Sequence, residues 1–139
     1  MMKKILLFVL LLGSLSSYAQ GIFEIHYRHV PVENMQEFEN LEMNYWYKVV
    51  QDAVDKDNLV AWSFHKRLDA GFVDFDEDAP THAFVLVYKD IDQYLNGGKV
   101  WENATEILGA DPSRFSTQEM SKTLFRQRYA FVDGIGSSE

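Results

Sequence analysis

The sequence predicts an α+β domain in which helices cover one face of a four-stranded antiparallel sheet. Four segments alternate between apolar and polar residues, which is the period of a half-buried strand. A longer segment between the first two repeats its apolar residues at every third or fourth position, as an amphipathic helix does. The chain shows neither an internal repeat nor a linker that would divide it, so we expect one domain.

The first strand is expected from Ile22 to Val30, and Pro31 ends it. Its two faces differ, because apolar Phe23, Ile25 and Tyr27 alternate with polar Glu24, His26 and Arg28. The long helix follows from Val32 to about Asp57. Its apolar stripe consists of Met35, Phe38, Leu41, Tyr45, Val49 and Ala53, widened by Met43, Trp46, Val50 and Val54. We expect this stripe to pack against the sheet.

Three further strands are expected at residues 59–68, 82–89 and 123–132. In the second strand, one face carries Val60, Trp62, Phe64 and Leu68, and the other carries Ser63, His65 and Arg67. The third strand has two fairly apolar faces, which favours a central position in the sheet. In the fourth strand, Phe125, Tyr129 and Phe131 lie opposite Arg126 and Arg128. The acidic, turn-rich residues 69–80 are expected to form an exposed connection.

Short helices are expected between the third and fourth strands. Asp90 is a favourable N-cap for a helix over residues 91–96, and Gly97 and Gly98 interrupt the helical pattern. Residues 100–108 have a helical pattern again. Asp111 followed by Pro112 predicts another helix start, for a helix that runs to about Lys122.

The first 19 residues have the layout of a secretory signal peptide. Lys3 and Lys4 precede an apolar run from Ile5 to Leu12, and small residues lie at both positions that favour cleavage after Ala19. The apolar run is far shorter than the about 20 residues that span a bilayer, so we expect no stable membrane anchor. The mature chain would be exported, to the periplasm or the extracellular space. Residues 20–132 would form its domain and residues 133–139 a flexible tail.

Composition excludes several classes of protein. The chain of 139 residues is 47% hydrophobic and 14% aromatic, which is too apolar for a disordered protein. It contains no cysteine, so disulfide scaffolds, thiolate metal sites and cysteine nucleophiles are excluded. The net charge is −8, and removal of the signal peptide makes it −10. We therefore expect no nucleic-acid partner, since nucleic-acid binding requires an excess of positive charge.

The order strand, helix, strand, strand, helices, strand is that of the ferredoxin-like fold, βαββαβ. In this topology the first and third strands are the central pair of the sheet. All helices lie on one face, so the other face is left for a partner or a ligand to cover.

The sequence also resembles the dimeric α/β-barrel superfamily, and within it small exported bacterial proteins. The resemblance rests on four stretches, which are Val30-Pro31-Val32-Glu33-Asn34-Met35, Glu42-x-x-x-Trp46, Asn58 to Phe64, and Asp78 to Phe84. It implies a homodimer whose two sheets form a barrel, often around a small-molecule cavity. The superfamily includes antibiotic-biosynthesis-type monooxygenases and haem-degrading enzymes. The haem-degrading members place an Asn on the first strand and a His on a later helix, and neither is present here.

The candidate binding site follows if the aromatic strand faces pack against the helices. The exposed face of the sheet would then gather Glu24, His26, Arg28, Ser63, His65, Arg67, Arg126 and Arg128, joined by His82 and Tyr88 if the phase of the third strand allows. Arginine binds carboxylate or phosphate groups, and histidine transfers protons near neutral pH. We therefore expect a small anionic or aromatic ligand in a pocket at the dimer interface. The protein would be a binder or a cofactor-independent, oxygenase-like enzyme.

Two other interpretations remain open. The same face could serve only for dimerisation, in a structural protein without a pocket. A metal at His26 and His65 is disfavoured, because Arg28 and Arg67 would repel a cation. We expect neither a metal nor a cofactor.

Overall fold

The structure is a computed structural model that describes residues 21–73 and 75–131. The predicted signal peptide, residues 1–19, and the predicted tail, residues 133–139, lie outside the described residues. No described helix has both the length and the apolar character needed to cross a membrane.

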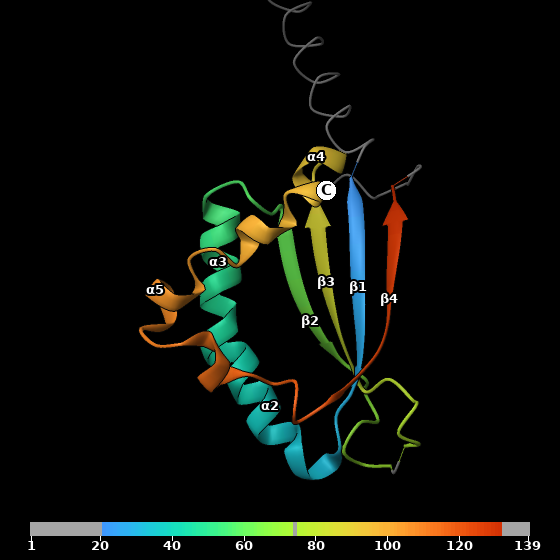
Figure 1. Ribbon diagram of the computed structural model, residues 1–139. Coiled ribbons are helices and arrows are strands. Elements are labelled where there is room, and N and C mark those ends of the chain that lie inside the picture. Colours follow the sequence, from blue (N-terminus) through green and yellow to red (C-terminus); the bar gives the residue numbers. More distant parts are fainter. Residues whose placement is uncertain (1–20, 74, 132–139) are drawn as a thin grey trace, which may run out of the picture.

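Four strands form one antiparallel sheet with the order β2-β3-β1-β4. They are β1 (Ile22–His29), β2 (Ala61–Lys66), β3 (His82–Tyr88) and β4 (Lys122–Ala130). The predicted ferredoxin-like fold is confirmed, including the central position of β1 and β3. Figure 1 shows the described helices together on one side of this sheet. We call the face toward these helices the inner face and the opposite face the outer face.

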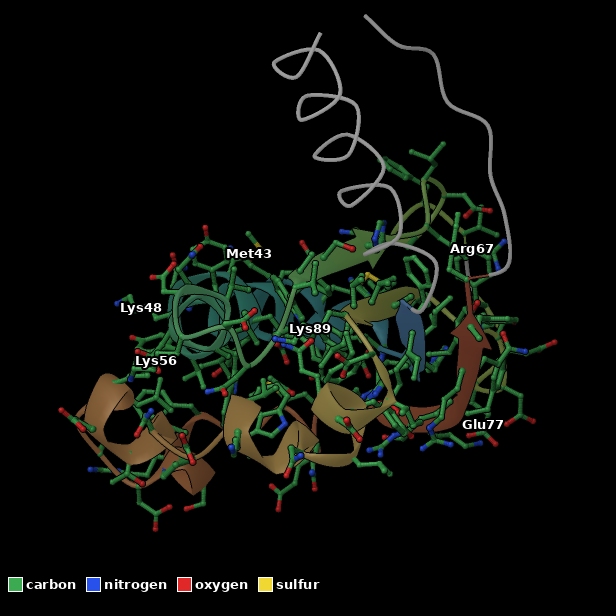
Figure 2. The ribbon with its side chains drawn as sticks, turned by 90° about the horizontal axis from the view of Figure 1, so that it is seen from above. Met43, Lys48, Lys56, Arg67, Glu77 and Lys89 are labelled. Atoms are coloured by element: carbon green, nitrogen blue, oxygen red, sulfur yellow. The ribbon has the colours of Figure 1, made fainter. Side chains whose placement is uncertain are left out.

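The predicted long helix is confirmed, but it is not a regular α-helix throughout. A 3₁₀ turn (Val32–Asn34) leads into α2 (Met35–Leu41), a π-helical segment (Glu42–Trp46) follows, and α3 (Tyr47–Asp55) completes the rod. The extra residue in the π-helical turn changes which side chains point to the sheet. Glu42 is buried there, whereas Met43, expected in the apolar stripe, is 49% exposed. Figure 2 shows Lys48 and Lys56 on the side of α3 that faces away from the sheet.

The connection from β3 to β4 contains α4 (Ile91–Leu95), a 3₁₀ turn (Gly97–Val100), α5 (Ala104–Leu108) and a second 3₁₀ turn (Pro112–Phe115). Both predicted caps are confirmed, because the carboxylates of Asp90 and Asp111 accept hydrogen bonds from the N–H groups of Gln93 and Ser113. The last helical turn ends at Phe115 rather than near Lys122. The backbone becomes extended at Ser116 and continues toward β4.

The core is formed where α2 and α3 pack on the inner face. One cluster centres on Val50, Ala53, Leu59, Leu86, Tyr88 and Val100, and the other on Val30, Met35, Phe38 and Ala70. Phe84 packs against both clusters and so joins them. The sheet and the long helix are thereby fixed relative to each other on both sides of Phe84.

The predicted orientation of β1 and β4 is wrong. Residues opposite each other in an antiparallel pair point to the same side of a sheet. Glu24 lies opposite Leu86 and His26 opposite Phe84, and both β3 residues pack against the helix core. Arg126 and Arg128 of β4 lie opposite His26 and Glu24. The polar sides of β1 and β4 therefore belong to the inner face.

The aromatic sides of β1 and β4 consequently belong to the outer face, where Tyr27 packs on Phe125 with ring centroids 4.6 Å apart. The prediction for β2 is confirmed in part, since Trp62 and Phe64 do lie on the inner face. Part of the charge on this polar inner face is neutralised there, because Arg128 forms an ion pair with Glu24.

Candidate functional site

A cavity of about 650 Å³ lies between the inner face of the sheet, the long helix and the β3–β4 connection. Its polar lining comes mainly from Glu24, His26 and Arg28 of β1, Glu42 of the helix, Thr117, and Arg126 of β4. Its aromatic lining comes from Trp46, Trp62, Phe84, Tyr88, Tyr94 and Trp101. This cavity lies on the face opposite to the one on which a pocket is expected from the sequence, and residues of a single chain line it.

The aromatic wall is held by packing and by one hydrogen bond. The indole N–H of Trp46 donates to the carbonyl oxygen of Phe115 at 2.8 Å, and the ring of Trp46 meets that of Trp101 edge to face at 6.0 Å. Tyr88 and Tyr94 form a second edge-to-face pair at 5.3 Å. All three tryptophans of the chain line the cavity, so their fluorescence reports on this site.

Glu24 is the buried centre of an ionic cluster on β1 and β4. Its Oε1 is 2.5 Å from His26 Nε2, and its Oε2 accepts a hydrogen bond of 2.8 Å from Arg128 Nε. Burial raises the pKa of Glu24, but the hydrogen bonds of His26 and Arg128 and the positive charge of Arg128 outweigh it and hold the pKa below its usual value. Glu24 is therefore a carboxylate at neutral pH.

His26 is held in the neutral form at pH 7. Burial lowers its pKa, and the positive charges of Arg126 and Arg28 act in the same direction against the carboxylate of Glu24. A neutral imidazole beside a cavity can accept or relay a proton.

Glu42 has a different environment from Glu24. It is only 7% exposed, and its Oε1 accepts a hydrogen bond of 2.8 Å from the hydroxyl of Thr117. Burial raises the pKa of Glu42 to about 7, against the opposing effects of Thr117 and the charge of Arg28. At neutral pH both protonation states of this carboxyl are populated, which suits a group that takes up and releases protons.

Glu42 is the first residue of the π-helical segment and is buried on the inward side of the helix. Phe38, Glu42, Trp46 and Val50 follow one another at intervals of four, and Glu42 takes the position between two aromatic residues. Single π-helical turns occur frequently at functional sites, because they redirect side chains within a helix.

Arg28 is tied to the chain that precedes β4. Its Nη2 and Nε donate to the hydroxyl of Ser121 at 2.6 and 3.1 Å, and its Nη1 donates to that of Thr123 at 2.9 Å. The hydroxyl of Ser121 in turn donates to the carbonyl oxygen of Thr117 at 2.8 Å. Residues 117–121 thus connect Arg28 on β1 with Glu42 on the helix.

The cationic charge of the cavity is not fully neutralised. Within the described part of the chain, Arg126 makes neither a hydrogen bond nor an ion pair, and Arg28 donates to hydroxyls rather than carboxylates. The carboxylate of Glu24 already contacts His26 and Arg128, and Glu42 is half protonated near pH 7, so neither fully neutralises Arg28 and Arg126. The polar end of the cavity therefore favours an anionic group, in a chain that is acidic overall.

The structure brings together most, but not all, of the predicted site residues. Glu24, His26, Arg28, Tyr88 and Arg126 line the cavity. Arg128 lies beside it, where its guanidinium binds Glu24 and stands 5.9 Å from the ring centroid of Tyr94. These residues therefore lie near one another, on the inner face rather than on the exposed face predicted from the sequence.

Three predicted residues lie elsewhere. His82 shares the inner face, but it is buried away from the cavity, between Phe38 and Phe64 and within 3.0 Å of Glu39. His65 points to the outer face, where its Nε2 is 2.8 Å from the hydroxyl of Ser63.

Arg67 lies beyond β2, where it binds Asp69 and covers the ring of Phe75 at 4.1 Å. Figure 2 shows Arg67 far from α3. His65 and Arg67 therefore do not belong to this site.

Glu42, Thr117, Ser121 and the tryptophans were not predicted as site residues. The signal for Glu42 was present, because a carboxylate between Phe38 and Trp46 interrupts an apolar stripe. The hydroxyl residues carry no such signal, since only the path of the chain before β4 brings them to the cavity. Among the described residues, no group of three or more His, Asp and Glu side chains is arranged to hold a metal ion.

Comparisons with known proteins support the fold. No protein-family model matches the sequence, and no curated protein matches it. A crystal structure of a dimeric ferredoxin-like protein from an uncultured marine organism is similar over 88% of this chain and 96% of its own, with a TM-score of 0.60 and 10% identity. HapK from Hahella chejuensis is similar over 85% of this chain and 96% of its own, with a TM-score of 0.54 and 14% identity. The chain therefore has the ferredoxin-like fold.

Proposed function

We propose that this protein binds a small aromatic molecule with an acidic group in the cavity on the inner face of its sheet. The observation that carries the proposal is the pairing of an aromatic wall with Arg126, a cationic side chain that lines the same cavity and has no anionic partner among the described residues. The cavity of about 650 Å³ has the size of small-molecule sites.

The two halves of the cavity favour different parts of such a ligand. Trp46, Trp62 and Trp101 offer flat apolar surfaces and ring edges for an aromatic ring. Arg126 offers a planar set of donors that matches a carboxylate. The likeness to two ferredoxin-like structures agrees with a small-molecule binder but names no ligand.

Tryptophan fluorescence tests the proposal directly, because all three tryptophans line the cavity. Titration with 3-phenylpropionate should change the emission in a saturable way, and the neutral 3-phenylpropionamide should bind more weakly. Arg126→Gln should weaken binding of the carboxylate by about tenfold, or about 1.4 kcal/mol, and leave binding of the amide unchanged.

Arg114→Gln is the matched control, because Arg114 is exposed and lies outside the cavity. It should bind both probes as the wild type does. An equal loss of affinity for 3-phenylpropionate in both variants would contradict an anion-binding cavity. So would a wild type whose fluorescence shows no saturable response to 3-phenylpropionate, 2-naphthoate and indole-3-acetate.

We also propose that the chain forms a homodimer through the outer face. On β1, β3 and β4 this face carries mainly apolar side chains, which are Phe23, Ile25, Tyr27, Val85, Val87, Phe125 and Tyr129. Phe125 is 45% exposed and Tyr129 is 49% exposed on the same face of β4, and exposed large apolar side chains on one surface indicate an interaction site. The marine protein of similar fold is dimeric, which supports a second copy of this chain as the partner.

Light scattering tests the dimer. The wild type should have the mass of two chains, and Tyr129→Glu should have the mass of one, because it places a charge within the proposed contact. Tyr47→Glu is the control, since Tyr47 is 43% exposed on α3. A monomeric wild type would contradict the dimer without affecting the cavity. A dimer whose cavity binds none of the probes would favour the alternative function, a structural protein.

Export is proposed from the sequence of residues 1–19. Mass spectrometry of the protein from its own cell should give Gln20 as the first residue and place the chain in the periplasmic or extracellular fraction. An intact Met1 in the cytoplasmic fraction would contradict this.

A further inference from the structure

The carboxyl group of Glu42 is available to a bound molecule. Its Oε1 accepts the hydrogen bond from Thr117, whereas its Oε2 makes no hydrogen bond with any described residue. No fully enclosed side-chain oxygen or nitrogen in the described part of the chain lacks a partner, so Oε2 is open to the cavity. Glu24, by contrast, uses both oxygens, one for His26 and one for Arg128.

The groups around Glu42 suit removal of a proton from carbon. Proton loss beside a carbonyl group places negative charge on the carbonyl oxygen, and a nearby cation stabilises that charge. Arg28 is near enough for its charge to act on Glu42, and its guanidinium is held in place by Ser121 and Thr123. Arg126 remains to bind an acidic group at another point of the same molecule.

We propose that Glu42 is a general base that enolises an aromatic oxo acid bound in this cavity, with Arg28 stabilising the enolate oxygen. The inference rests on the proposed binding function and adds a reaction to it. The Glu42 carboxylate takes a proton from the carbon next to the carbonyl group. The electron pair of the C–H bond forms a C=C bond, and the pair of the C=O bond moves to oxygen.

Return of the proton from Glu42 to oxygen gives the enol, and return to carbon restores the ketone. Atoms and electrons balance in both directions, and the step requires no oxidant, reductant or co-substrate. Glu42 is restored at the end of each cycle.

Among the ionisable residues that line the cavity, Glu42 has the pKa that best suits a general base at neutral pH. The titratable and charged groups that share the cavity with it are Glu24, His26 and Arg28 from β1, Tyr88 from β3, Tyr94 and Arg126. Glu24 and His26 have lowered pKa values, and burial raises the pKa of Tyr88 to about 12. The pKa of Glu42, at about 7, lies near neutrality, where a general base is most effective.

Phenylpyruvate is a suitable probe, because it has an aromatic ring, a carboxylate and a carbon-bound proton next to a ketone. In D2O, proton NMR should show loss of its methylene signal faster with the protein than in buffer alone. Glu42→Gln should reduce this protein-dependent exchange by about a hundredfold or more. The same variant should still bind 3-phenylpropionate, since the amide keeps the size of the side chain and an oxygen that accepts from Thr117.

Glu119→Gln is the control, because Glu119 is exposed and lies outside the cavity. It should exchange as the wild type does. The pH profile gives a measurement that does not depend on the folding of Glu42→Gln. The exchange rate of the wild type should rise to a plateau above about pH 7, and Thr117→Val should move the midpoint to higher pH.

The two proposals fail in different ways. If 3-phenylpropionate does not bind the wild type, the binding function itself is wrong. If it binds but phenylpyruvate exchanges no faster than in buffer, or Glu42→Gln exchanges as fast as the wild type, only the general base is overturned.

Discussion

The hydroxyl of Thr117 donates a hydrogen bond of 2.8 Å to Oε1 of Glu42 and joins two residues of the cavity that are 75 positions apart in the sequence. Both residues are at most 8% exposed. The bond stabilises the charged form of a carboxyl that burial makes difficult to ionise. The chain before β4 thus influences the protonation of a residue on the helix.

Thr117→Val should raise the pKa of Glu42 above about 7, because it removes the donor that favours the carboxylate. The side-chain carboxyl carbon of Glu42 can be followed by NMR during a pH titration. Above the midpoint, the variant should also lose about 1 to 3 kcal/mol of unfolding free energy. Thr105→Val, at an exposed position of α5, is the control. An unchanged midpoint would show that the hydrogen bond has little effect on ionisation.

Glu42→Gln should change how stability depends on pH. The pKa of Glu42 is raised from 4.5 in the unfolded chain to about 7 in the folded protein, so the folded state holds this proton more tightly. The wild type therefore loses stability as pH rises from about 4.5 to 7, and the full loss of about 3 kcal/mol is present above pH 7.

The glutamine variant has no such loss. Relative to the wild type it should gain about 3 kcal/mol between pH 4.5 and pH 8, as measured by urea unfolding at several pH values. A difference between the two proteins that does not vary with pH would mean that Glu42 ionises normally.

The order of the strands and helices could be predicted from the sequence because it depends on local patterns. The two-residue alternation of β1, the caps at Asp90 and Asp111, and the stripe along the long helix are all set by neighbouring residues. The ferredoxin-like topology then follows from the order of the elements. The caps at Asp90 and Asp111 were predictable because a carboxylate just before a helix accepts hydrogen bonds from the free N–H groups of the first turn.

The inward face of β1 could not be predicted in this way. Alternation shows that a strand has two different faces, but it does not show which face is inside. That choice depends on the pairing of His26 with Phe84 and on the neutralisation of Glu24 by Arg128, a residue 104 positions away. Hydrophobic burial is the usual rule, and that rule alone predicts Phe23 and Tyr27 in the interior.

Arg128→Gln should make the ionisation of Glu24 less favourable. The pKa of Glu24 is lowered in the folded protein, so its carboxylate contributes stability above pH 4.5, and that contribution is lost as pH falls through the folded pKa. The variant should therefore show a smaller loss of stability in acid than the wild type, together with a higher pKa of Glu24 in an NMR titration. Arg114→Gln should behave as the wild type, and an equal acid dependence in Arg128→Gln would contradict the role of this ion pair.

Trp46→Phe should destabilise the protein more than Trp101→Phe does. Trp46 loses its hydrogen bond to the carbonyl of Phe115 and leaves space in a packed wall, whereas Trp101 is 42% exposed. We expect a loss of about 1 to 3 kcal/mol for Trp46→Phe and less than about 1 kcal/mol for Trp101→Phe in urea unfolding. Because Phe115 ends the 3₁₀ turn before residues 116–121, the Trp46 bond also holds the chain that carries Thr117. Trp46→Phe should therefore also move the midpoint of the Glu42 titration. An equal loss of unfolding free energy in the two variants, with an unchanged midpoint, would contradict this link between Trp46 and Thr117.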